Sequence, residues 1–140
     1  MNEVATRTLV VERHLKHPAE KVWRALTEPV LIEDWLMKND FRAAVGHKFN
    51  LRTDPVQNWS GVLDCEVLEV EPQRRLSYTW NTGEGPERLQ TVVTYTLIPE
   101  AGGVLLRMEQ SGFVRENAFR GAEYGWGMFL TRFEQVLGKL

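Results

Sequence analysis

The sequence predicts an α+β fold in which a long C-terminal helix covers one face of an antiparallel β-sheet. Apolar and polar residues alternate through most of residues 41–112, as they do in strands with one buried face. Turns that contain proline or glycine separate the alternating runs, which is typical of hairpins. From residue 119 onward the apolar spacing becomes three and four, the pattern of an amphipathic helix. A sheet with one apolar face needs a cover, and this helix is the one predicted element large enough.

The N-terminal part is predicted to form one strand and two short helices. Residues 8–15 carry apolar side chains on one face of a strand. Pro18 ends this strand, because proline has no N–H for a sheet ladder and its φ suits the first turn of a helix. The two helices are expected over residues 19–26 and 30–37, the second next to Pro29.

Five further strands are expected to form an antiparallel meander. Their predicted ranges are 48–52, 59–70, 75–80, 89–98 and a last strand that begins at residue 104. The adjacent apolar residues Val67 and Leu68 break the alternation of the second range, which indicates either a β-bulge or a strand with two apolar faces. Turns or loops are expected at residues 71–74, 82–86 and 99–103.

The C-terminal helix is expected to run to Leu140 and contains three glycines, Gly121, Gly125 and Gly127. Each costs about 1 kcal/mol relative to alanine in a helix interior. Gly121 and Gly125 fall on one helical face. That face either approaches the sheet closely or leaves volume for a ligand, and both interpretations stay open from the sequence.

Composition predicts a small soluble domain of the cytoplasm. The chain has 140 residues, of which 43% are apolar and 26% charged, so we expect one globular domain over residues 1–140. A formal charge of −2 lacks the basic surplus of a nucleic-acid-binding protein. No apolar run is long enough to span a bilayer, and the first residues do not resemble a signal peptide. The single cysteine, Cys65, suits a reducing compartment.

Several segments together carry a family resemblance. They are residues 18–29 followed by Trp35, Gly46 with Phe49, residues 67–72, residues 76–80, the Gly102-Gly103 hairpin and Gly125-Trp126. With them the chain resembles the START-like (SRPBCC) helix-grip superfamily, and within it the activator-of-heat-shock-protein-90-ATPase homologue (AHSA-type) domain family, over nearly its whole length. The sequence departs from the family pattern at Leu36, His47 and Val104, which bears on the mouth of a pocket.

The resemblance implies a curved antiparallel sheet, two short helices after the first strand, and a hydrophobic cavity between the sheet and the C-terminal helix. It also implies a lipid-like or other hydrophobic small molecule as ligand. By family analogy alone, a chaperone is a further candidate partner.

Aromatic and apolar side chains in phase with the cavity face are the predicted ligand-binding residues. Their alternative role is to fill the core, which we expect for Trp23, Phe119 and Phe133. The predicted binding residues are Trp35, Phe49, Trp59, Tyr78, Trp80, Tyr95, Met108, Trp126 and Phe129.

Reactive side chains form no arrangement specific for catalysis or metal binding. His14 and His17 have an H-x-x-H spacing, but no third ligand stands near them in the sequence. Cys65 is in phase with buried neighbours and has no evident base. His47 follows a turn near the rim of the sheet, where an acid or base could act. We therefore expect no metal, no cofactor and no assigned catalytic residue.

Three functions remain in competition. The first is a module that binds an apolar or amphipathic small molecule as a monomer or homodimer, without nucleic acid or a membrane span. The second is a cyclase-like or hydrolase-like enzyme, with His47, Tyr78, Tyr95 and Gln110 as candidate residues. The third is a domain that acts on a chaperone ATPase.

Overall fold

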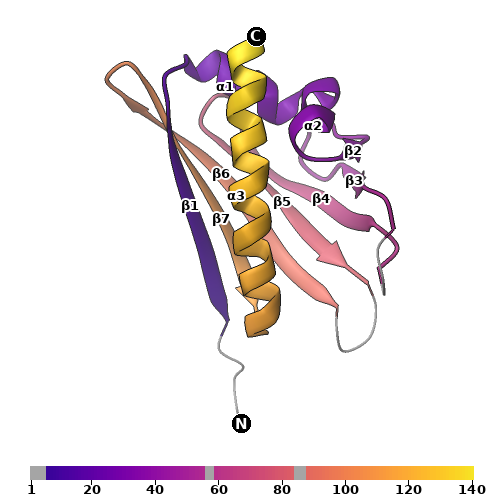
Figure 1. Ribbon diagram of the computed structural model, residues 1–140. Helices are drawn as coiled ribbons and strands as arrows, with labels where there is room; N and C mark the ends of the chain where they lie inside the picture. Colours follow the sequence, from indigo (N-terminus) through magenta and orange to yellow (C-terminus); the bar gives the residue numbers. More distant parts are fainter. Residues whose placement is uncertain (1–5, 56–58, 84–87) are drawn as a thin grey trace.

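A seven-stranded antiparallel sheet and a long C-terminal helix form the two layers of the structure (Figure 1). The computed structural model describes residues 6–55, 59–83 and 88–140, so part of the predicted loop 82–86 lies outside the described residues. In chain order the elements are β1 (Arg7–Leu15), α1 (Ala19–Thr27), α2 (Pro29–Trp35), β2 (Lys38–Asn39), β3 (Lys48–Arg52), β4 (Val62–Glu71), β5 (Arg75–Thr82), β6 (Leu89–Glu100), β7 (Gly103–Phe113) and α3 (Glu116–Lys139). The predicted α+β helix-grip architecture is confirmed.

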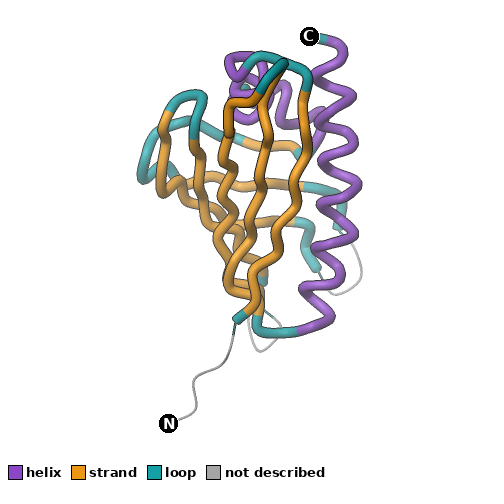
Figure 2. The backbone as a smooth tube through the Cα atoms, turned by 90° about the vertical axis from the view of Figure 1, so that its left-hand side faces the viewer, coloured by secondary structure: helices purple, strands orange, loops and turns teal. Residues whose placement is uncertain are grey.

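The order of strands across the sheet is β1-β7-β6-β5-β4-β3-β2. Strands β2 to β7 are therefore neighbours in sequence and in space, as hairpin connections require. The first strand instead joins the sheet beside β7, where Leu15 pairs with Val104 and Thr8 with Ser111. Seen from the side, the strands form one layer and α3 runs along it as the second (Figure 2).

Local irregularities follow from particular residues. Of the two alternatives left open for Val67 and Leu68, the structure shows the bulge: the pairing of β4 with β5 shifts register between Val67 and Glu69 and leaves Leu68 44% exposed. The predicted strand 59–70 instead begins at Val62. The turn after β4 is closed by the Arg74 N–H, which donates to the Glu71 carbonyl at 2.9 Å.

The C-terminal half of α3 packs tightly into the core. Trp35 at the end of α2 meets Phe133 of α3 edge-on, with 4.9 Å between ring centroids, and meets Tyr95 of β6 at 6.3 Å. The Trp35 indole N–H donates to the Ala25 carbonyl at 2.8 Å, so its one polar group is paired inside the core. Trp35 of α2 thus fills space between this half of α3 and the sheet.

Across the described ranges, no helix is both long enough and apolar enough to cross a membrane. Helix α3 has the length, with 24 residues, but polar and charged side chains such as Glu123 and Arg132 occupy its outer face.

Candidate functional site

A pocket of about 260 Å³ lies between the first half of α3 and the neighbouring ends of β5, β6 and β7. Its lining is mostly apolar and comes from both layers of the fold. The described lining residues are Trp80, Thr82, Leu89, Gln110, Arg115, Ala118, Gly121, Ala122, Gly125, Trp126 and Phe129.

The helix leaves this space open because its pocket face carries small residues: Ala118, Gly121, Ala122 and Gly125. A Cβ atom added at Gly121 would have nothing within 4 Å, and one added at Gly125 would meet only the Phe129 ring, at 3.9 Å. Neither glycine is needed for a close approach of the helix to the sheet. Of the two interpretations open from the sequence, the structure therefore favours volume between the layers.

Three aromatic rings form one wall of the pocket. The rings of Trp80 and Trp126 are tilted by 45° with 5.3 Å between centroids, and Phe129 meets Trp126 edge-on at 5.7 Å. Trp80 belongs to the inward-facing residues of β5, and Trp126 and Phe129 follow one another on the inner side of α3. The exposed fractions of Trp80 and Trp126 are 7% and 1%, so their edges, rather than whole ring faces, border the open space.

A chain of hydrogen bonds lies behind this wall. The Trp126 indole N–H donates to the side-chain oxygen of Gln110 at 2.7 Å, and the Gln110 amide nitrogen donates to the Thr91 hydroxyl at 2.9 Å. The Thr91 hydroxyl in turn donates to the Trp80 carbonyl at 2.7 Å. Gln110 is 1% exposed and lines the pocket, so it is a buried polar group at the border of an apolar space.

The predicted binding residues divide into two groups. Trp80, Trp126 and Phe129 line this pocket together. The other six are not among its described lining residues. They are Trp35, Phe49, Trp59, Tyr78, Tyr95 and Met108.

Most of this second group lies in the aromatic core. Phe49 meets Phe41 and Tyr78 edge-on, each at 5.2 Å between ring centroids. Met108 and Tyr95 are completely buried. Trp59 stands apart from them, half-buried, and its indole N–H donates to the Val62 carbonyl at 3.3 Å.

The buried tyrosines are paired with each other. The hydroxyls of Tyr78 and Tyr95 share a hydrogen bond of 2.7 Å, and burial raises the pKa of both phenols well above the ordinary value. Cys65 is similar, because burial, followed by the nearby Asp64 and Asp40 carboxylates, raises the pKa of its thiol to about 12. At neutral pH these three groups are protonated, and they do not line the pocket.

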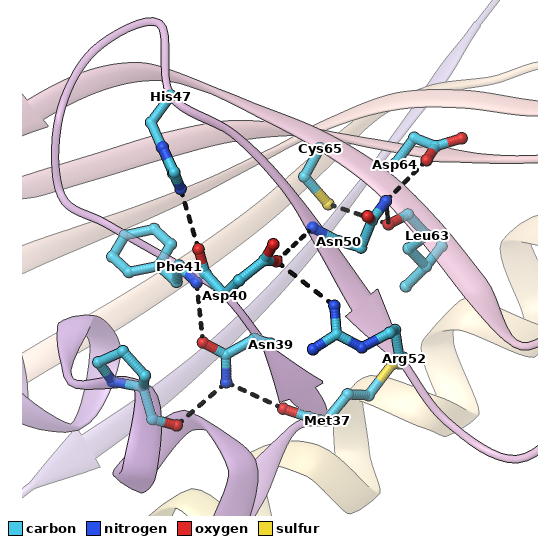
Figure 3. A network of polar contacts seen from close by, with 11 residues as sticks. Met37, Asn39, Asp40, Phe41, His47, Asn50, Arg52, Leu63, Asp64 and Cys65 are labelled. Carbon is cyan, nitrogen blue, oxygen red and sulfur yellow. Dashed lines mark hydrogen bonds and ion pairs between the residues drawn. The ribbon is translucent and has the colours of Figure 1, made fainter.

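His47 belongs to a polar network that connects the segment after α2 to β3 and β4 (Figure 3). Its Nε2–H donates to the Asp40 carbonyl at 2.9 Å, since a carbonyl only accepts. The Asp40 carboxylate accepts the Asn50 backbone N–H at 2.8 Å and lies 3.5 Å from the Arg52 guanidinium. The Asn50 side chain donates to Asp64 at 2.8 Å. This network holds β3 and its connections in place, and His47 does not line the pocket.

The two histidines of the H-x-x-H motif have different surroundings. His14 lies 2.7 Å from the Glu100 carboxylate across the end of the sheet. The hydrogen bond and the charge of Glu100 raise the pKa of His14, whereas burial, followed by the charge of Lys21, lowers that of His17. In the part of the chain that the structure describes, no group of three or more potential ligands is placed to hold a metal ion.

Two other depressions are weaker candidates. One of about 270 Å³ lies between α2 and the end of α3, and its lining includes Asp34, Arg132 and Lys139. Another of about 220 Å³ lies at the hairpin between β6 and β7, beside His14. Neither combines an aromatic wall with a buried polar side chain, so the pocket under the first half of α3 is the candidate site.

Comparison with known structures finds the same fold along nearly the whole chain. Protein MLL2253 from Mesorhizobium loti is 55% identical, with a TM-score of 0.89, over 95% of this chain and 98% of its own. CalU16 from Micromonospora echinospora is 25% identical, with a TM-score of 0.78, over 94% of this chain and 76% of its own. DynU16, described as a protein in the dynemicin biosynthetic locus, is 25% identical with a TM-score of 0.79. The match covers 94% of this chain and 47% of DynU16.

The family comparison agrees with the structural one. No curated protein matches the sequence. The family model described as "Activator of Hsp90 ATPase homolog 1-like protein" matches residues 16–138, which is most of the chain. The START-like helix-grip fold expected from the resemblance is the fold of this structure. The chain therefore belongs to the family of activator of Hsp90 ATPase homolog 1-like proteins.

Proposed function

We propose that this chain is a small-molecule-binding module of a single domain, and that it takes an apolar or amphipathic ligand into the pocket under the first half of α3. The observation that carries the proposal is the pocket itself, with its mostly apolar lining from both layers. An apolar cavity of about 150 Å³ holds benzene. By the same scale, 260 Å³ has room for roughly ten non-hydrogen atoms.

The chemistry of the lining supports binding over catalysis. Among the described lining residues the one ionisable side chain is that of Arg115, and arginine is not a residue type that serves as a general acid or base. General acid–base catalysis needs a group that gains and loses a proton near the working pH. The sequence offered four candidates for an enzymatic role. Tyr78 and Tyr95 are buried elsewhere with raised pKa values, and His47 does not line the pocket. Gln110 lines it, but a side-chain amide is not an acid or base in this pH range.

The relatives add a second line of support. DynU16 is described as a protein of a biosynthetic locus, a setting in which small organic molecules are made. Because this chain and DynU16 share a fold, this similarity supports a small organic molecule as the ligand of this chain.

The test is a thermal-shift screen of wild-type protein against fatty acids, aromatic polyketides, steroid-like compounds and two-ring aromatics. A ligand at one hundred times its Kd should add about 2.7 kcal/mol to the free energy of unfolding. Gly125→Leu places four carbon atoms in the pocket, so that room for roughly six of the ten ligand atoms is left. This variant should lose the ligand-induced rise in melting temperature.

Gly127→Leu is the matched control. It adds the same side chain to the same helix, and nothing lies within 4 Å of an added Cβ at this position, which does not line the pocket. This variant should keep the shift. A wild-type protein that no compound stabilises, or a Gly125→Leu variant that binds as tightly as Gly127→Leu, would contradict the proposal.

A further inference from the structure

We propose that the pocket selects a flat aromatic ligand with a hydrogen-bond-accepting oxygen, and that the side-chain amide of Gln110 recognises this oxygen through its second N–H. This inference rests on the proposed function and adds the chemical class of the ligand. It depends on how the amide is oriented, on which of its N–H groups has a partner, and on the shape of the wall beside it.

The orientation of the Gln110 amide follows from its partners. An indole N–H is a donor and never an acceptor, so the atom of Gln110 that lies 2.7 Å from the Trp126 nitrogen has to be the oxygen. A backbone carbonyl only accepts, so the Thr91 hydroxyl has to donate its proton to the Trp80 carbonyl oxygen, 2.7 Å away. The Thr91 oxygen is then the acceptor for the Gln110 nitrogen at 2.9 Å. Both ends of the amide are assigned by chemistry alone.

This assignment leaves one donor of Gln110 without a partner. The NH₂ group has two N–H bonds, and the structure pairs one of them, with Thr91. The second has no hydrogen-bond partner among the described residues. Because Gln110 is 1% exposed and lines the pocket, a molecule inside the pocket is the partner within reach. A donor that stays unpaired in such a place is costly, which favours a guest that brings an acceptor.

The aromatic part of the proposal comes from the walls. Trp80, Trp126 and Phe129 form an aromatic wall on one side, in which Trp80 and Trp126 present ring edges, with 5.3 Å between the Trp80 and Trp126 centroids and 5.7 Å between those of Trp126 and Phe129. On the other side, the small residues at Gly121 and Gly125 let a planar ring lie against the helix. Aromatic rings gain from edge-to-face and offset contacts with one another. A two-ring molecule of roughly ten non-hydrogen atoms fits the volume.

The probe pair is 1-indanone and indane, which differ by one carbonyl oxygen. Their Kd values are measured by NMR titration for wild-type protein and for Gln110→Met, a side chain of similar length without the amide. Wild-type protein should prefer 1-indanone over indane, and Gln110→Met should lower that ratio about fivefold, the factor that corresponds to one net hydrogen bond. Phe129→Leu is the control, because it should weaken both ligands and leave their ratio unchanged.

A second measurement uses wild-type protein alone, in case Gln110→Met folds poorly. Binding of 1-indanone should move one of the two side-chain amide proton signals of Gln110 downfield, and indane should move neither by a comparable amount. Equal ratios in wild-type protein and Gln110→Met, or equal amide shifts with both probes, would overturn this inference and leave the proposed function standing. Failure of both probes to bind overturns it too, and the wider thermal-shift screen then decides the proposed function separately.

Discussion

Replacing the pocket-facing glycines of α3 with alanine should make the protein more stable. Glycine in a helix interior costs about 1 kcal/mol relative to alanine, and neither Gly121 nor Gly125 has a positive φ that would make a side chain strained. The added Cβ meets nothing within 4 Å at Gly121 and only Phe129, at 3.9 Å, at Gly125. The double variant should therefore gain about 2 kcal/mol in free energy of unfolding.

Urea denaturation followed by circular dichroism measures this gain, and the melting temperature should rise by about 4 °C per kcal/mol for a chain of this size. Gly61→Ala is a control for which we expect the opposite change in stability. Gly61 has a φ of +85°, and an added Cβ would lie 2.3 Å from the Thr53 carbonyl oxygen, so this variant should lose stability. A loss of stability in Gly121→Ala or Gly125→Ala would refute the reasoning, because it would mean that α3 approaches the sheet there and that the pocket is closed.

Three further predictions concern groups away from the pocket. The hydrogen bond and charge of Glu100 raise the pKa of His14 above its ordinary 6.5, so this pair stabilises the fold below pH 6.5 and the contribution is lost as the pH rises through the raised pKa. NMR titration of the ring should show a lower pKa in Glu100→Gln, and an unchanged pKa would argue against the pair. Cys65, with a pKa of about 12, should not react with a thiol reagent at pH 8 until denaturant unfolds the protein; rapid reaction of the native protein would be inconsistent with its burial. Trp35→Phe should lower the free energy of unfolding by about 2 kcal/mol in urea, because the buried Ala25 carbonyl loses its donor, and a loss under 0.5 kcal/mol would count against that bond's importance.

The main elements of the fold were accessible from the sequence because their periods are strong. Alternation in β5 and β7 and the three-and-four spacing of α3 each reflect one buried face. The ends of the helices and strands were harder to predict than their existence. Helix α3 begins at Glu116, but its first residues are polar, so the apolar stripe becomes visible only at Phe119. Strand β2 was not predicted, because two residues that pair with β3 have no period of their own.

The candidate site was predictable only in part. Tyr78 and Trp80 both point inward from β5 and have the same pattern in the sequence, yet Tyr78 bonds Tyr95 in the core and Trp80 lines the pocket. The difference depends on tertiary contacts, because Tyr78 faces Phe49 and Tyr95 whereas Trp80 faces Trp126 of α3, and local spacing does not encode those partners. The small residues Ala118 and Ala122 were missed for this reason. Whether a ligand contacts any of the nine predicted residues stays a prediction.

The place of β1 beside β7 has a consequence for how the protein is made. Strand β1 is synthesised before the other strands of this sheet and pairs with β7, so Leu15 cannot pair until Val104 has been made, nor Thr8 until Ser111 has been made. Closing so long a stretch of chain carries a large entropy cost before any ladder forms. We therefore expect the hairpins from β3 to β7 to associate early in biosynthesis. Strand β1 would then dock late, so that the sheet is completed only after β7 has been translated.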